Sequence, residues 1–128
     1  MNFLVIDDSK HVHSVVQSFL EKKGIKCYSA FDGQLAVKAI TDKLANESKH
    51  YDLILLDWNM PNMTGPEFLE HVKETKLTTC PIVMMTTENS IEKITFALEN
   101  GAIEYIMKPF TEDILLNKIE FVIGSLAA

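Results

Sequence analysis

The feature that most constrains this sequence is an alternation, repeated about five times, between short apolar runs and longer amphipathic stretches. Runs of four or five residues suit a buried strand and are too short for a typical helix. Strands that alternate with helices along a chain form a parallel sheet. The sequence therefore predicts an α/β fold of the (βα)5 type, a doubly wound five-stranded parallel sheet with helices on both faces.

Five short runs are rich in apolar or β-branched residues. We expect strands at Phe3 to Ile6, Lys26 to Ala30, Leu53 to Leu56, Ile82 to Thr86 and Tyr105 to Met107. The first, third and fourth runs are nearly all apolar, which is typical of central strands whose two faces are both buried.

The stretches between these runs carry helix signals. The first predicted helix ends at Gly24, and its apolar residues are three and four positions apart, at Val12, Val15, Val16, Phe19 and Leu20. The second begins at the Asp32-Gly33 turn. The residues that we expect it to bury are Ala36, Ala39, Ile40 and Leu44.

Capping residues mark three further helices. Thr64-Gly65-Pro66-Glu67 is typical of a capping box, with Thr64 as the N-cap. The next helix should begin after Asn89-Ser90 and end at Asn100-Gly101. The last should begin at Thr111, where two acids favour the positive end of the helix dipole. The residues that we expect this last helix to bury are Ile114, Leu115, Ile119, Val122 and Ile123.

Length and composition suit one globular core, with 128 residues of which 47% are apolar and 23% charged. We therefore expect residues 1–128 to form a single domain without a separate effector domain. The net charge of −6 comes without a basic block, which argues against direct DNA binding. No secretory leader or apolar run of roughly 20 residues is visible, so we expect a cytoplasmic protein without membrane insertion. Cys27 and Cys80 are isolated and are expected to be buried free thiols.

Polar residues stand at the ends of four predicted strands. Asp7 and Asp8 follow the first strand and Asp57 follows the third. Thr86 closes the fourth, and Lys108 follows the fifth. Ligands of open parallel sheets bind beyond the carboxyl ends of the strands, where the strand order reverses. We therefore expect these five side chains to meet in one crevice.

Three carboxylates in one crevice are costly unless a cation neutralises them. Hard divalent cations prefer oxygen ligands, so the acids predict a site for Mg²⁺, or alternatively Mn²⁺. An aspartate can also act as a nucleophile and form an aspartyl-phosphate. Asp57 is the candidate nucleophile, because an acid that ends a buried apolar run has no packing role. Lys108 and the Thr86 hydroxyl are suited to bind the phosphoryl oxygens.

Each of these residues also has a purely structural interpretation. An acidic pair before a helix is often only an N-terminal cap. Lys108, which precedes a proline, would be a solvated loop side chain, and Thr86 and Tyr105 would be ordinary strand residues. Their conjunction at four strand ends favours a functional site.

Four strings in this order resemble the receiver domains of two-component signalling, and the resemblance covers essentially the whole chain. They are VIDDS at Val5 to Ser9, LLDWNMPNMTG at Leu55 to Gly65, MTT at Met85 to Thr87 and YIMKPF at Tyr105 to Phe110. The segment from Asp57 to Met63 is most similar to the chemotaxis regulators of the CheY type. The resemblance implies a flavodoxin-like fold with the strand order 2-1-3-4-5.

The same resemblance implies a chemical role for the strand-end residues. A histidine kinase would phosphorylate Asp57, and Lys108 would pair with the phosphoryl group. The metal ligands would be Asp7, Asp8, Asp57 and the backbone carbonyl of Asn59.

A conformational switch is also implied. Thr86 would move toward the phosphoryl group and Tyr105 would turn inward. The face built from the fourth helix, the fifth strand and the fifth helix would then bind an output protein, such as a flagellar motor switch component. Thr87 takes a position where many members of the family have a small residue like alanine, and its branched side chain is expected to hinder the rotation of Tyr105.

Asn59 and Glu88 lie two residues beyond Asp57 and Thr86, near the expected path of water to the phosphoryl group. In the family such positions tune self-dephosphorylation, and this pair suggests a short-lived signal. We expect a phosphoacceptor that acts as a monomer and is not an enzyme. A separate phosphatase is a further possible partner.

Three other functions compete with a motor-controlling regulator. A phosphate sink or phosphorelay intermediate would share the same chemistry. An aspartyl-nucleophile phosphatase generally has a second acid two residues past the nucleophile, where this chain has Asn59. A flavin or nucleotide module is disfavoured because the loop from Asp7 to Lys10 has neither a G-x-G-x-x-G pattern nor a phosphate-binding P-loop.

Overall fold

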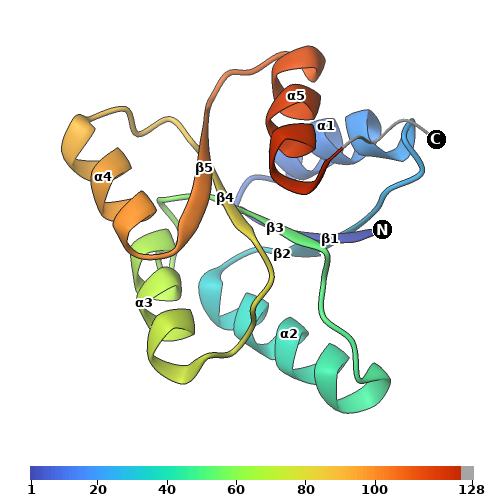
Figure 1. The fold of residues 1–128 in the computed structure, drawn as a ribbon, viewed down its shortest axis with the longest axis vertical. Coiled ribbons are helices and arrows are strands. Elements are labelled where there is room, and N and C mark those ends of the chain that lie inside the picture. Colours follow the sequence, from blue (N-terminus) through green and yellow to red (C-terminus); the bar gives the residue numbers. More distant parts are fainter. Residues whose placement is uncertain (125–128) are drawn as a thin grey trace.

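The computed structural model describes residues 1–124 and has three layers, with a parallel sheet between two layers of helices (Figure 1). The strands are β1 (Asn2–Ile6), β2 (Lys26–Ala30), β3 (Leu53–Leu56), β4 (Ile82–Thr86) and β5 (Ala102–Met107). The helices are α1 (Lys10–Glu21), α2 (Gly33–Glu47), α3 (Gly65–Thr75), α4 (Ile91–Glu99) and α5 (Glu112–Ile123). The strand order is β2-β1-β3-β4-β5, so the predicted doubly wound fold is confirmed. The last four residues of the predicted domain lie outside the described residues.

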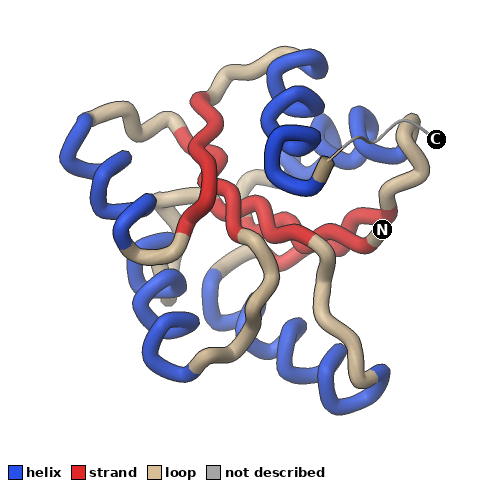
Figure 2. The backbone as a smooth tube through the Cα atoms, in the orientation of Figure 1, coloured by secondary structure: helices blue, strands red, loops and turns tan. Residues whose placement is uncertain are grey.

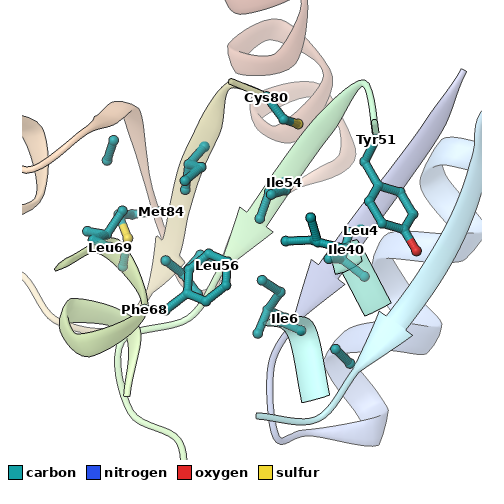
Figure 3. Close-up of a cluster of buried hydrophobic side chains, with 14 of the residues drawn as sticks. Leu4, Ile6, Ile40, Tyr51, Ile54, Leu56, Phe68, Leu69, Cys80 and Met84 are labelled. Atoms are coloured by element: carbon teal, nitrogen blue, oxygen red, sulfur yellow. The ribbon is translucent and has the colours of Figure 1, made fainter. Parts of the chain in front are cut away.

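Each face of the sheet has its own hydrophobic core. Helices α1 and α5 cover one face, and α2, α3 and α4 cover the other (Figures 1 and 2). Alternate residues of β1 point to opposite faces: Leu4 and Ile6 join the larger core, whereas Phe3 and Val5 join the smaller one. Figure 3 shows part of the larger core, where Phe68 of α3 packs among side chains of the central strands. All residues of β3 and β4 are buried, as predicted.

Polar side chains begin the helices as expected. Thr64 forms the complete capping box with Glu67, and Asp32, Ser90 and Thr111 each accept a backbone N–H from the first turn of their helices. Helix α1 ends before Gly24, which has a φ of +74° as a residue that ends a helix often has. None of the helices in residues 1–124 is long and apolar enough to cross a bilayer.

Strand β5 begins earlier than predicted, at Ala102 instead of Tyr105. Gly101 has a φ of +112°, which lets the chain pass from α4 directly into the strand. The early residues were missed because β5 is an edge strand: Ile103 is exposed and Glu104 half-buried, so the run is not continuously apolar.

Two expected core residues lie at the surface. Leu44 of α2 is 40% exposed and Ile114 of α5 is 47% exposed. In α2 the buried stripe continues from Ile40 to Lys43, whose stem takes the place predicted for Leu44. In α5 the buried residues are Leu115 and Ile119, and Ile114, which precedes Leu115, lies outside this buried stripe. The predicted free thiols are confirmed, with Cys80 buried and Cys27 partly buried.

Candidate functional site

The carboxylates predicted to converge do so at the carboxyl edge of the sheet, where β1 lies between β2 and β3. The Asp7 N–H donates to Ala30 O (3.1 Å) and the Asp57 N–H donates to Ile6 O (2.8 Å), which extends the strand ladders into both acidic residues. Oxygen atoms of Asp7, Asp8 and Asp57 all lie within 4.8 Å of one another. Asp7 and Asp57 are buried, and Asp8 is exposed.

Lys108 joins this cluster from the end of β5. Its Nζ lies 2.6 Å from Asp7 Oδ2 and 3.5 Å from Asp57 Oδ1, and its side chain is 14% exposed. The Lys108 N–H donates to Thr86 O (2.9 Å), which fixes the residue beside the end of β4. A freely solvated loop lysine is therefore the wrong interpretation of this residue.

The acidic pair does not cap α1. Ser9 is the N-cap, and its hydroxyl accepts the Val12 N–H at 3.3 Å. Asp7 Oδ1 instead accepts the Ser9 N–H at 2.9 Å, while Oδ2 contacts Lys108. The interpretation of Asp7 and Asp8 as N-terminal caps of α1 is thus excluded, and the Asp7 carboxylate faces the strand-end cluster.

The electrostatics of Asp57 reflect crowding of like charges. Burial and the negative charge of Asp7 raise the pKa of the Asp57 carboxyl above its ordinary value. The charge of Lys108, the Trp58 N–H and the Thr86 hydroxyl act in the opposite direction. The Trp58 N–H donates to Asp57 Oδ1 at 2.8 Å, which fixes the orientation of this carboxylate.

The donor set fits a hard divalent cation. Among residues 1–124, these three carboxylates are the one group of acidic, histidine or cysteine side chains whose ligand atoms could share a metal ion. All their donors are oxygen, and two of the three residues are buried with Lys108 as their cationic contact. Oxygen-only coordination by a few carboxylates is what Mg²⁺ takes, usually together with water and phosphate oxygens.

The end of β4 connects this cluster with Tyr105. Thr86 is fully buried, and its Oγ1 accepts the Glu88 N–H at 3.2 Å. The Tyr105 hydroxyl donates to Glu88 O at 2.7 Å, and the ring is 8% exposed. Tyr105 therefore occupies an inward position in this structure. Thr87 is exposed and is compatible with that position. Its expected hindrance of the rotation of Tyr105 stays a prediction.

Asn59 and Glu88 contact each other across the crevice, although they come from different loops. Asn59 Nδ2 donates to Glu88 Oε1 at 3.0 Å, and Lys93 Nζ lies 3.0 Å from Glu88 Oε2. The hydrogen bonds from Asn59 and Lys93 hold the pKa of Glu88 below its ordinary value. Glu88 is therefore an ionised carboxylate with both oxygens engaged.

Two close approaches position the loop between β3 and α3. A Cβ atom at Gly65 would overlap the backbone carbonyl oxygen of Asp57, and one at Gly33 would lie 2.6 Å from Met63 Cγ. Asn62 Nδ2 also donates to Asp32 Oδ2 at 2.8 Å, which ties the same loop to the start of α2. The loop that carries Asn59 is thus fixed at both ends.

Sequence reasoning missed two polar side chains near the site. His13 is 6% exposed, and its Nε2 lies 2.7 Å from Asp7 O. Its spacing from Val16 and Leu20, three and seven positions, could have placed it on the buried face of α1. Lys93 had no such signal, because its contacts with Glu88 and Trp58 depend on how α4 packs.

The fold and this strand-end cluster agree with the family comparison. Residues 3–120 match the model of the response regulator receiver domain, and the chain belongs to this family.

Individual relatives show the same similarity over nearly the full chain. A chemotaxis protein CheY homolog of Campylobacter jejuni is 33% identical over 126 residues, which cover 98% of this chain and 94% of the relative. A crystal structure of a two-component response regulator from Clostridium difficile has a TM-score of 0.86 at 30% identity and covers 100% of this chain and 99% of that one. The transcriptional regulatory protein DltR of Streptococcus agalactiae is 36% identical over 119 residues, which cover 93% of this chain but 50% of DltR.

Proposed function

We propose that this protein is a response regulator that accepts a phosphoryl group on Asp57 from a histidine kinase. The observation that carries the proposal is the buried carboxylate of Asp57 at the end of β3, within 3.5 Å of Lys108 and grouped with two further acids. A buried acid among like charges has no structural advantage, whereas a phosphoacceptor needs this combination of carboxylate, cation and metal ligands.

Transfer would form a bond between an Asp57 oxygen and phosphorus while the bond from phosphorus to the imidazole nitrogen of the kinase breaks. The imidazole leaves with the bonding electron pair and takes up a proton. Lys108, which now contacts both Asp7 and Asp57, would then bind a phosphoryl oxygen. The Thr86 hydroxyl, at the end of the neighbouring strand, would donate to another.

Mg²⁺ would be held by Asp7, Asp8, Asp57 and the backbone carbonyl of Asn59, and Mn²⁺ would fit the same ligands. When bound, the ion offsets negative charge on the phosphoryl oxygens. The hydrogen bond from Trp58 and the contact with Lys108 leave the second oxygen of Asp57 as the one better placed to react. The backbone N–H of Ser9 donates to Asp7 Oδ1 and so fixes the orientation of the Asp7 carboxylate as a metal ligand.

The signal would reach partners through α4, β5 and α5. Tyr105 lies on β5 and contacts the carbonyl of Glu88, the second residue after Thr86, so a movement of Thr86 toward a phosphoryl group would alter this contact. Each of the three elements carries an exposed isoleucine: Ile91 is 83%, Ile103 55% and Ile114 47% exposed. Exposed apolar side chains of this kind suit a protein partner.

The output that we propose is control of a flagellar motor, and the similarity to a chemotaxis protein of C. jejuni supports a role in chemotaxis. The partners would then be a chemotaxis-type histidine kinase, a motor switch component and possible accessory phosphatases, all in the cytoplasm. A phosphate sink or phosphorelay intermediate would use the same site with other partners. An aspartyl phosphatase is disfavoured because the residue two positions past Asp57 is Asn59, whose amide already donates to Glu88.

The decisive experiment is labelling with acetyl phosphate in the presence of Mg²⁺. We expect the unmodified protein to take up one phosphoryl group and Asp57→Asn to take up none. Asp42→Asn is the matched control, because Asp42 is an exposed residue of α2 paired with Lys38. A pulldown with protein in both states then identifies the output partner. An unmodified protein that takes up no label would refute the proposal.

Asn59 and Glu88 are proposed to set the lifetime of the phosphoryl group. Their hydrogen bond places an amide and a carboxylate beside the loop that follows Asp57. Replacing both with leucine should lengthen the lifetime, because water would lose its polar contacts near the phosphoryl group. Decay of labelled protein after removal of the donor measures this, and an unchanged decay rate would contradict the assignment.

A further inference from the structure

Lys93, in the first turn of α4, contacts two residues beside the phosphoacceptor. Its Nζ lies 3.0 Å from Glu88 Oε2 and 5.7 Å from the centroid of the Trp58 ring. The other oxygen of Glu88 accepts the amide of Asn59 at 3.0 Å. The Glu88 carboxylate is therefore shared between the loop that follows Asp57 and helix α4.

The contacts of Trp58 extend this link to Asp57 itself. The backbone N–H of Trp58 donates to Asp57 Oδ1 at 2.8 Å. The Trp58 ring meets the Phe96 ring edge to face, with the centroids 6.0 Å apart. Lys93 and Phe96 are three positions apart in α4, so they lie on the same face of this helix. One side of α4 thus contacts the Trp58 ring with a cation and an aromatic edge.

The charges at this edge of the sheet are unequal. The three clustered acids and Glu88 make four carboxylates, whereas the cations that contact them are Lys108 and Lys93. Lys108 is already shared between two acids of the cluster, so Lys93 is the cation that offsets Glu88. Without Lys93, an unopposed carboxylate would stand where an anionic phosphodonor has to approach.

We infer that Lys93 is a positioning residue for the phosphoacceptor site, which holds Glu88 against Asn59 and offsets its charge during approach of an anionic donor. The inference rests on the proposed phosphorylation of Asp57. It assigns to α4 a direct influence on how fast the site is loaded, in addition to any role in output.

The ion pair of Lys93 with Glu88 is well suited to mutational tests, because we expect it to contribute little to stability. The side chains of Lys93 and Glu88 are 41% and 26% exposed, and exposed ion pairs of this kind have small effects on folding. We therefore expect Lys93→Met to unfold at the same temperature as the unmodified protein. Its effects on labelling then report on the site.

The test compares two small phosphodonors of different charge at low ionic strength. Lys93→Met should be labelled about fivefold more slowly than the unmodified protein by acetyl phosphate. With phosphoramidate, which carries one negative charge fewer, the loss should be about half as large on a logarithmic scale. Lys93→Arg should restore the rate with both donors, and about 0.5 M salt should reduce the difference between donors. Emission of Trp58, the single tryptophan of the sequence, should change in Lys93→Met because the cation over its ring is lost.

A double-mutant cycle identifies Glu88 as the residue through which Lys93 acts. In a Glu88→Gln background, Lys93→Met should slow acetyl phosphate labelling by less than twofold, because no carboxylate remains to be offset. An equal loss with both donors, a full fivefold loss in the Glu88→Gln background or an unchanged rate in Lys93→Met would each overturn the inference.

The matched control is Lys38→Met, which removes a lysine from the exposed ion pair with Asp42 on α2 and changes the net charge equally. Its labelling rate should equal that of the unmodified protein. A similar loss in Lys38→Met would attribute the effect to overall charge and overturn the role of Lys93. Failure of the unmodified protein to be labelled by either donor would instead refute the proposed function, so the two failures are distinguishable.

Discussion

Lys43 is a buried lysine and Lys108 is a partly buried one, and the groups around their Nζ atoms differ. Lys43 has a side chain that is 5% exposed, and its Nζ lies 5.1 Å and 5.5 Å from the ring centroids of Tyr51 and Tyr28. Its carboxylate contact is a single one, with the exposed Glu47 at 3.4 Å. Lys108 contacts carboxylates, with Asp7 at 2.6 Å. Aromatic rings hold a cation permanently, whereas carboxylates that bind a metal or a phosphoryl group change their charge. The composition of the surroundings, more than burial, therefore separates a structural lysine from a reactive site.

The largest expected difference between the two lysines is chemical. Lys108→Met should slow acetyl phosphate labelling more than about hundredfold, because a charge-assisted contact with the transferred group is lost. Lys43→Met should stay within about twofold of the unmodified rate. Initial labelling rates at saturating Mg²⁺ measure both, with circular dichroism as the check on folding. Similar rates in the two variants would contradict the comparison.

Substitution of Lys43 should affect stability, although it should hardly affect labelling. Lys43→Ala should lower the free energy of unfolding by about 2 kcal/mol, because both the packed stem and the cation over two rings are lost. Lys43→Met keeps the stem and should recover most of this loss. Urea denaturation of both variants tests the prediction, and equal losses would show that the charge matters more than the stem.

Magnesium should stabilise the region of Lys108 and leave that of Lys43 unaffected. At an Mg²⁺ concentration of about ten times its dissociation constant, binding to the native state should add about 1.4 kcal/mol. Lys43→Met should retain the full increment, whereas Asp8→Asn should lose most of it because a candidate ligand is neutralised. Calorimetric unfolding with and without Mg²⁺ measures the increment. An undiminished increment in Asp8→Asn would place the metal elsewhere.

A further expected effect concerns two tyrosines, one in each region. Burial, with the charges of Glu88 and Asp57, raises the pKa of Tyr105 to about 12, and burial also raises the pKa of Tyr51. A raised pKa in the folded state stabilises it below the ordinary value of 10.0, and this contribution is lost as the pH rises toward 12. The free energy of unfolding should therefore fall between pH 10 and 12, and less steeply in Tyr105→Phe. An identical slope in that variant would contradict the assignment.

Much of the region around Asp57 and Lys108 was predictable from the sequence, because its residues follow strands with strong local signals. Asp57 ends the four-residue run of β3, and Lys108 follows β5. The rule that ligands bind beyond the carboxyl ends of parallel strands was sufficient to bring them together. The roles of these side chains in phosphorylation remain predictions.

The region of Lys43 could not be predicted in the same way. Lysine is rarely buried, so the pattern favoured Leu44 as the inward residue of α2. The packing of Tyr28 from β2 and Tyr51 from the loop before β3 places two rings beside the Lys43 cation. Contacts that depend on how elements pack, like that between Lys93 and Glu88, leave no trace in local periodicity.

The close approach of Gly65 to the carbonyl of Asp57 also limits how this sequence can diversify. Any side chain at position 65 would force apart the start of α3 and the backbone of Asp57. Asn59 and Glu88, in contrast, are joined by one hydrogen bond between partly solvated side chains. Under the proposed roles, an engineer would adjust the lifetime of the phosphoryl group at positions 59 and 88 and leave position 65 untouched, because that glycine preserves the backbone around Asp57.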